Sequence, residues 1–207
     1  RRSVSKGGEA YTTFRVGEPH GRPSARVQLI HDMLADIDSV KITTNLWGER
    51  WSKLVQNAMG NGLSAASGMS NKQFTQNDIT RRLSIRLAGE AVRAGLSQGL
   101  SLEKIAGVDP NVWVQAAEEL NTGANDTPVL DELEARMLTQ AERMSDTARP
   151  SMGQDMIKGR RTEIEFLNGL VVQRAHEMGL EAPANAGLIA AVQMVERGDA
   201  PPDLARV

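Results

Sequence analysis

The chain has 207 residues, a formal net charge of −2 and no cysteine. The near-neutral charge argues against a strongly basic nucleic-acid-binding protein, and the lack of cysteine excludes a disulfide scaffold, a thiolate zinc site and a cysteine nucleophile. No apolar run approaches the ~18 residues of a membrane-spanning helix. We therefore expect a cytoplasmic protein with neither a nucleic acid nor a membrane as partner, built as one domain plus a fragment.

The first part of the chain predicts a strand, a helix and a second strand. Residues 11–16 are aromatic and β-branched and end at a turn, which is typical of a strand. Ser24 is a candidate cap for a helix whose apolar residues recur at helical spacing, and residues 40–44 form a second strand pattern. Such a unit is too small to bury both faces of a sheet by itself.

From Leu46 onward the pattern is helical almost throughout, so the predicted fold class is mainly α, a helical bundle. We expect helices near residues 46–66, 77–98, 109–120, 128–144, 151–158, 163–178 and 184–197. Glycines provide plausible stops, at Gly99, Gly107, Gly123, Gly159, Gly179 and Gly198. Thr162 and Glu165 have the spacing of a capping box.

Lys53, Asn57 and Asn61 form the first candidate site. Their i, i+4, i+8 spacing places all three on one face of a continuous α-helix, each turned ~40° from the last. Asparagine is a poor helix former, so two asparagines on one helix face suggest a role other than helix stability. A lysine and two carboxamides can donate hydrogen bonds to a small polar molecule. The alternative is an ordinary solvated face.

Ser151 and Glu163 form the second candidate site. Gly159 and the capping-box pattern predict two short helices rather than one, with Ser151 near the start of the first and Glu163 near the start of the second. Helix N-termini favour anions, so Ser151 suits a ligand carboxylate. The alternative is ordinary helix capping. Asn168 within the second helix indicates close packing or a bound group.

Three other sequence patterns give weaker indications of function. Gly60-x-Gly62-x-x-Ala65 matches a dinucleotide-binding fingerprint, but a helical pattern precedes it where the fingerprint needs a strand. No residues have the spacing of metal ligands, so we expect no metal. The three tryptophans are predicted to pack in the core or at an interface, and the first two of them to anchor the helix that carries Lys53; they are Trp47, Trp51 and Trp113.

Four longer motifs resemble a known family. They are Leu46-Trp47 with Trp51-x-Lys53-Leu54-x-x-Asn57-x-x-x-Asn61; Ser151-Met152-x-Gln154-Asp155; Gly159-Arg160-x-Thr162-Glu163-Ile164-Glu165-x-x-Asn168-Gly169; and Gly179-Leu180-x-x-Pro183-Ala184-Asn185. Together they resemble the ketopantoate reductase (2-dehydropantoate 2-reductase) family over nearly the whole chain. The Lys53 set and the Ser151 to Glu163 set are specific in combination.

The resemblance implies roles for these residues. Lys53 would be the general acid that protonates the developing alkoxide, and Glu163 would hydrogen-bond the reacting oxygen region or a substrate hydroxyl and help to hold Lys53. Their chemistry fits, because ketone reduction needs a proton donor at the carbonyl oxygen.

Four further residues would bind the substrate. Asn57 and Asn61 would orient the 2-oxo acid and its hydroxyl, and Ser151 would take its carboxylate. Asn71 falls where the family has another substrate-side asparagine.

The resemblance also divides the chain. Residues 1–45 look like the trailing strands and helix of a Rossmann domain that is mostly missing, and residues 46–207 like the all-helical substrate-binding domain. NADPH is the implied cofactor, bound through the missing domain, so its contacts are unknown here. We therefore expect the 207 residues alone to bind NADPH weakly or not at all and to reduce no ketopantoate.

The expected function is that of the helical domain of an NADPH-dependent enzyme that reduces 2-dehydropantoate to pantoate, in pantothenate and coenzyme A biosynthesis. A reductase for a different branched 2-oxo acid is an alternative. A non-catalytic dimerisation or interaction module derived from the family is another. A bundle that lacks its partner domain should expose apolar surface, which makes a homodimer plausible.

Overall fold

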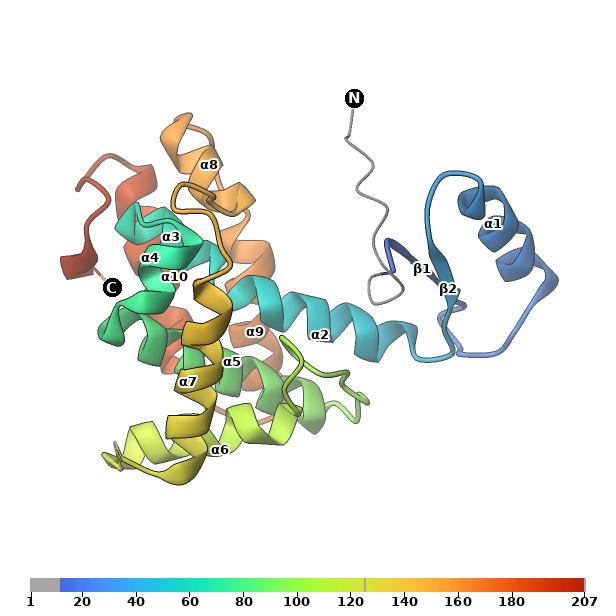
Figure 1. Cartoon of the computed structure of the whole chain (residues 1–207), viewed down its shortest axis with the longest axis horizontal. Coiled ribbons are helices and arrows are strands. Elements are labelled where there is room, and N and C mark those ends of the chain that lie inside the picture. The colour runs from blue at the N-terminus through green and yellow to red at the C-terminus, as the bar shows by residue number, and fades with distance from the viewer. Residues whose placement is uncertain (1–11, 125, 207) are drawn as a thin grey trace. The chain divides into compact units, whose positions relative to one another are not determined.

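In the computed structural model, residues 12–124 and 126–206 are described, and the chain divides into two compact units, Arg1–Arg50 and Trp51–Val207 (Figure 1). The division falls inside helix α2, Leu46–Ala58, whereas the sequence suggests a boundary between residues 45 and 46.

The first unit is a strand, a helix and a strand, as predicted. β1 (Phe14–Val16) and β2 (Val40–Ile42) pair in parallel, with Phe14 opposite Val40, and α1 (Ala25–Ala35) connects them. Ser24 caps α1, because its Oγ accepts a hydrogen bond of 3.1 Å from the Val27 N–H. The start of the predicted first strand, at Tyr11, lies outside the described residues.

Glu18 ties the turn after β1 to the start of α1. Its carboxylate accepts hydrogen bonds from the Arg26 guanidinium and from Ser24 Oγ, and these bonds lower the pKa of Glu18 to about 2. The turn is thereby fixed although the unit has little apolar core.

α1 keeps an apolar face uncovered within the described part of the first unit. Leu29, Met33 and Ile37 are each more than three-fifths exposed. This agrees with the expectation that a single strand-helix-strand unit cannot bury all of its apolar surface.

The second unit is a helical bundle (Figure 1). Its helices after α2 are α3 (Asn61–Ser67), α4 (Asn71–Gln76), α5 (Asp78–Ser97), α6 (Pro110–Thr122), α7 (Pro128–Ala141), α8 (Ser151–Ile157), α9 (Ile164–Glu177) and α10 (Pro183–Glu196), and a 3₁₀ turn, η1, follows at Leu204–Arg206. The mainly α prediction is confirmed, and α5 to α10 lie within a few residues of their predicted positions. Two details differ. α4 was not expected, and the predicted helix at residues 46–66 is divided into α2 and α3.

Five of the six glycine stops are also confirmed; the exception is Gly107, which lies in the turn between α5 and α6 and ends no helix. Gly99, Gly123, Gly159, Gly179 and Gly198 adopt φ values from 61° to 81° at or directly after the ends of helices. This left-handed conformation lets the last turn close its hydrogen bonds without the steric cost that a Cβ would add.

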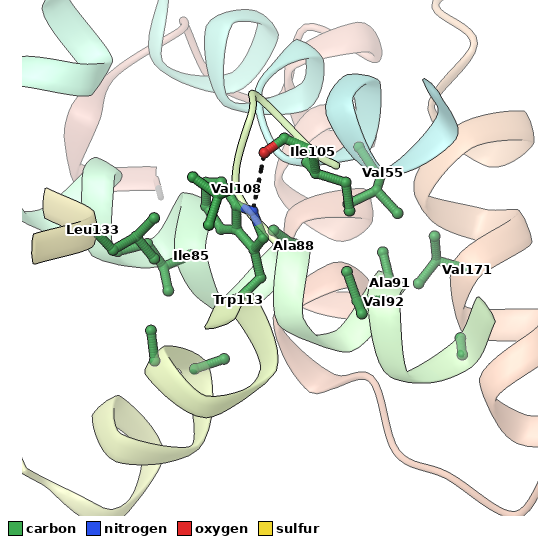
Figure 2. Close-up of a cluster of buried hydrophobic side chains, with 14 of the residues drawn as sticks. Val55, Ile85, Ala88, Ala91, Val92, Ile105, Val108, Trp113, Leu133 and Val171 are labelled. Carbon is green, nitrogen blue, oxygen red and sulfur yellow. Dashed lines mark hydrogen bonds between the residues drawn. The ribbon is translucent and has the colours of Figure 1, made fainter. Parts of the chain in front are cut away.

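The central core of the bundle surrounds α5, which packs against α6, α9 and α10. Figure 2 shows Trp113 of α6 among Ile85, Val108 and Leu133, with its Nε1 donating a 3.2 Å hydrogen bond to the Ile105 carbonyl. The indole buries a large apolar ring and still satisfies its polar N–H.

Two of the three tryptophans are buried as predicted. Trp51 is 7% exposed, packs against Gly95 and donates a 2.8 Å hydrogen bond to the Ala91 carbonyl, so it anchors α2 on α5. Trp47 does not pack in the core, because its side chain is 53% exposed, and the interface alternative stays a prediction. Trp47 instead donates to the Pro19 carbonyl at the surface of the first unit, where the Arg50 guanidinium lies 5.9 Å from its ring.

A second core cluster joins α3, α8, α9 and α10 and contains Leu63, Met152, Ile164 and Leu188. Gly62 allows this packing, since an added Cβ would lie 2.8 Å from Leu188. The elements that carry Asn61, Ser151 and Glu163 are therefore held together by one apolar core.

Candidate functional site

α2 and α3 are separated by a break at Met59 and Gly60, and this break changes the expected Lys53 stripe. Lys53 and Asn57 share a face of α2, but Asn61 is the first residue of α3. The single face predicted for all three residues is therefore wrong for Asn61. Gly60 packs against the ring of Phe74 in α4. A Cβ added at Gly60 would lie 3.1 Å from the nearest carbon of that ring, so the break is in close contact with α4.

A cavity of about 300 Å³ lies where α2, α4, α5, α6 and α7 meet the start of α3. Its lining is mostly apolar, with carboxamides from four elements, and comprises Gln56, Met59, Gly60, Asn61, Asn71, Phe74, Thr75, Ser84, Ala106, Trp113, Met137, Gln140, Met144 and Pro150. Apolar walls with a few placed polar groups are typical of small-molecule sites, and about 300 Å³ is the lower end of their volumes.

Asn61 and Asn71 are brought together by this cavity. Each is half-buried and is the first residue of its helix, Asn61 of α3 and Asn71 of α4. The two side chains are ten positions apart in the sequence, and only the α2–α3 break and the short α4 bring both to one wall. These are two of the four predicted substrate-binding residues.

Lys53 and Asn57 lie on α2 near the lining residue Gln56, although neither of them lines the cavity. Gln56 lines it, and in an α-helix Lys53 lies ~4.5 Å further back along the axis and ~60° around it. Lys53 is exposed and Asn57 is half-buried. An exposed ammonium group one turn from Gln56 can reach a ligand at the rim of the cavity.

The segment before α8 is fixed against the turn between α3 and α4. The Arg149 guanidinium donates two hydrogen bonds, of 3.2 and 3.0 Å, to the Gly68 carbonyl, and the Asn71 N–H donates to the Ala148 carbonyl at 3.0 Å. Pro150 then lines the cavity, and Ser151, which is exposed, opens α8 next to it. The predicted division into two short helices, α8 and α9, is confirmed.

Glu163 is exposed and directly precedes α9. Among the described residues, no hydrogen bond or ion pair joins it to Lys53. The cavity lining includes neither of them, so the roles given to Lys53 and Glu163 stay predictions.

The capping box predicted at Thr162 is not formed. Thr162 Oγ1 accepts from the Ile164 N–H at 3.3 Å instead of from that of Glu165, and the Thr162 N–H is taken by the Glu196 carboxylate. The Glu165 carboxylate is bonded elsewhere, to Gln193 at 3.1 Å. Partners from α10 thus replace the local pairing.

Asn168 is explained by packing. It is fully buried in α9, and its Nδ2 donates to the Ala58 carbonyl at 3.0 Å and to Asn185 Oδ1 at 2.9 Å. Asn185 Nδ2 donates in turn to the buried Glu90 carboxylate, which also accepts the Ala184 and Asn185 N–H groups at the start of α10. This network joins the end of α2 to α5, α9 and α10.

Several cavity residues were not identified from the sequence. Gln56 is adjacent to Asn57 and could have been found from the same stripe. Ser84, Trp113 and Met137 come from helices far away in the sequence, and no motif marks them as ligand-facing.

The described residues do not fit a dinucleotide cofactor. Gly60 and Gly62 follow a helix, and Gly62 is packed against Leu188 and Ile164, so their backbone is not the strand-turn-helix that cradles a pyrophosphate. The strands of the described chain are limited to β1 and β2. Gly60 and Gly62 follow α2 and not a strand, so they lack the context that the dinucleotide fingerprint requires.

The described residues lack both a metal-binding cluster and a membrane-spanning helix. They contain no group of three or more histidine, cysteine, aspartate or glutamate side chains placed to hold a metal ion. None of the helices in this part of the chain combines the length and the apolar character needed to cross a membrane.

A family model and several curated relatives that resemble this chain all carry the name of ketopantoate reductase or its synonym, 2-dehydropantoate 2-reductase. The family model described as "Ketopantoate reductase PanE/ApbA C terminal" matches residues 45–196. A 2-dehydropantoate 2-reductase of Archaeoglobus fulgidus is 27% identical over 192 residues, which are 92% of this chain and 54% of that protein. The chain spans about half the length of the curated relatives it matches.

Solved structures share the fold. A PanE/ApbA family ketopantoate reductase from Ralstonia eutropha JMP134 superposes with a TM-score of 0.65 at 21% identity, covering 91% of this chain and 53% of that one. A D-mandelate dehydrogenase in complex with NADH superposes with a TM-score of 0.67 at 17% identity, covering 89% of this chain and 54% of that one. At these identities the likeness concerns the fold alone.

Proposed function

The chain belongs to the family of ketopantoate reductase C-terminal domains, and we propose that it is the substrate-binding helical domain of a reductase that converts 2-dehydropantoate to pantoate. The observation that carries this proposal is the cavity that collects Asn61 and Asn71 on its wall, with Lys53 about one helical turn from its lining residue Gln56. The names of the curated relatives support the substrate.

The proposed chemistry uses the ammonium, carboxamide, hydroxyl and carboxylate groups of the predicted site residues. The Lys53 ammonium donates a proton to the oxygen of the ketone as negative charge develops there. Carboxamide N–H groups of Asn57, Asn61 and Asn71 hold the oxygens of the 2-oxo acid, and Ser151 Oγ donates to its carboxylate. Glu163 orients Lys53 when the substrate is bound.

The cofactor is proposed to be NADPH, which supplies the reducing equivalents when it is bound. The described residues contain no site that fits it, so its contacts are not assigned to them. The D-mandelate dehydrogenase structure holds NADH, which makes a comparison of NADPH with NADH part of any assay of the full-length protein.

Replacing Lys53 tests the proposal. In the full-length protein, Lys53→Ala should lower the turnover of 2-dehydropantoate by ~10²-fold or more, because the proton donor is lost. Lys104→Ala is the matched control, since Lys104 is exposed and lies outside the cavity lining. Steady-state rates of NADPH oxidation measure both. Equal turnover in the two variants would remove Lys53 from the role of general acid.

A different 2-oxo acid is the second candidate substrate. The reason to test it is that a protein with the same fold is named D-mandelate dehydrogenase. Comparing kcat/KM for 2-dehydropantoate and for phenylglyoxylate, the oxo acid that corresponds to mandelate, decides between them. Turnover of neither by the full-length protein would favour the non-catalytic interaction module.

The homodimer and the cytoplasmic location stay predictions. Light scattering of the purified full-length protein measures its mass in solution and would show whether two copies associate.

A further inference from the structure

Ser84 is an exceptional side chain in the wall of the cavity. Ser84 lies in α5 and is only 1% exposed, and its Oγ has no hydrogen-bond partner within the part of the chain that the structure describes. Among the described residues, the other buried side-chain atom without a partner is an amide oxygen, Asn168 Oδ1, and the other buried hydroxyl groups are hydrogen-bonded. Thr80 Oγ1 donates to the Phe74 carbonyl at 2.6 Å and Ser67 Oγ to the Leu63 carbonyl at 2.6 Å. Native proteins leave few buried polar groups unpaired, and each such group needs an explanation.

The position of Ser84 in the helix makes the missing bond more unusual. A serine inside a helix commonly turns its hydroxyl back to the carbonyl four residues earlier, as Ser67 does in α3. Ser84 makes no bond of this kind within the described residues. Its hydroxyl is therefore available to a group that enters the cavity.

The surroundings of Ser84 define what that group should be. Phe74, Trp113 and Met137 provide the apolar wall, while Asn61 and Asn71 provide the polar groups. A ligand that fits has an anionic or carbonyl end for the carboxamides, a compact apolar body for the aromatic and thioether side chains, and one hydroxyl for Ser84.

Resting on the function proposed above, we propose that the cavity holds the side chain of the 2-oxo acid and that Ser84 Oγ hydrogen-bonds the hydroxyl at its end. A hydroxyl group both donates and accepts, so this bond adds to the orienting role that the family resemblance gives to Asn57 and Asn61. The side chain of 2-dehydropantoate has the required pattern, a carbon with two methyl groups and a hydroxymethyl group. The methyl groups pack on Phe74 and Met137, and the hydroxyl gives Ser84 its missing partner. Ser84 is thus a specificity-determining residue.

A pair of substrates that differ in one hydroxyl tests the proposal. 3,3-Dimethyl-2-oxobutanoate is 2-dehydropantoate without its hydroxyl. With the full-length protein and saturating NADPH, kcat/KM for the hydroxylated substrate should exceed that for the deoxy analogue by about tenfold or more, because the analogue leaves Ser84 unpaired. Ser84→Ala should lower this preference about tenfold.

The control variant is Ser97→Ala. Ser97 lies in the same helix, is exposed and donates to the Ala94 carbonyl, so the preference for the hydroxylated substrate should stay as in the unmodified protein. Ser84→Ala should also unfold at the same or a higher temperature, since it removes an unpaired buried hydroxyl.

The outcomes separate this inference from the proposed function. If the unmodified protein reduces 2-dehydropantoate but shows no preference over the deoxy analogue, the role of Ser84 is overturned and the reductase function stands. The same holds if the preference survives in Ser84→Ala. If the unmodified protein reduces neither compound, the proposed function itself fails.

Discussion

At the scale of single residues, some buried polar groups of the bundle line the cavity and others hold the helices together. Ser84 Oγ and Asn168 Oδ1 are both buried without a hydrogen-bond partner among the described residues. Ser84 lines the cavity, whereas Asn168 is fully buried and donates from its Nδ2 to the Ala58 carbonyl and to Asn185. The Ala58 carbonyl is at the end of α2, the helix that carries Lys53. Asn168 belongs to α9 and holds the end of α2 through this hydrogen bond, although it does not line the cavity.

Replacing Asn168 by alanine should destabilise the fold. The change leaves the Ala58 carbonyl and Asn185 Oδ1 buried without their donor, which costs about 1–3 kcal/mol of the free energy of unfolding. Urea unfolding of the protein measures the change. The matched control is Asn121→Ala, at an exposed position of α6, where the effect should stay within about 0.5 kcal/mol. Equal effects of the two substitutions would show that the buried network contributes nothing.

At the scale of elements, close helix contacts determine the shape of the cavity. α5 carries Ser84, and α6 carries Trp113, so the approach of these two helices places both residues on one wall. Gly89 makes that approach possible, because a Cβ at this position would overlap Ala117 and lie 3.0 Å from the Trp113 carbonyl oxygen.

Two glycine substitutions should therefore have opposite effects. Gly89→Ala should destabilise the bundle by about 1–3 kcal/mol, because the helices must move apart to accommodate the methyl group. Gly187→Ala, in α10, has open space around its added Cβ and should stabilise the fold by about 0.5–1 kcal/mol through helix propensity. Thermal unfolding of both variants checks the signs. A stabilising Gly89→Ala would contradict the close contact.

At the scale of the whole molecule, the chain contains a helical bundle and a strand-helix-strand unit. The bundle has two apolar core clusters and a cavity. The described part of the first unit has two strands and leaves Leu29, Met33 and Ile37 on α1 exposed. The residues proposed to bind the 2-oxo acid all lie in the bundle.

The 207 residues alone should therefore not bind NADPH with useful affinity. Their described part offers no strand-turn-helix with glycines that could hold a pyrophosphate. Titrating the purified chain into NADPH should leave the nicotinamide fluorescence unchanged, while the full-length protein should change it. Binding by the 207-residue chain at micromolar concentration would refute this prediction and point to a dinucleotide site that differs from the known fingerprint.

The sequence by itself determined the features that depend on neighbours along the chain. Ser24 caps α1, the left-handed glycines such as Gly123 and Gly179 end their helices, and the α8–α9 break occurs at Gly159. These signals are local, because a cap or a left-handed turn needs only the residues within one helical turn. The combined motifs also led to the family, which the match over residues 45–196 confirms.

Only the tertiary structure decided which residues meet. Gly60 breaks the helix because the Phe74 ring lies against it, Glu196 displaces the predicted capping box at Thr162, and Trp47 stays at the surface. The cavity likewise brings Ser84 to the wall that carries Asn61, which no spacing in the sequence reveals. The physical reason is that such contacts join residues far apart in the chain, and their energy depends on how whole helices pack.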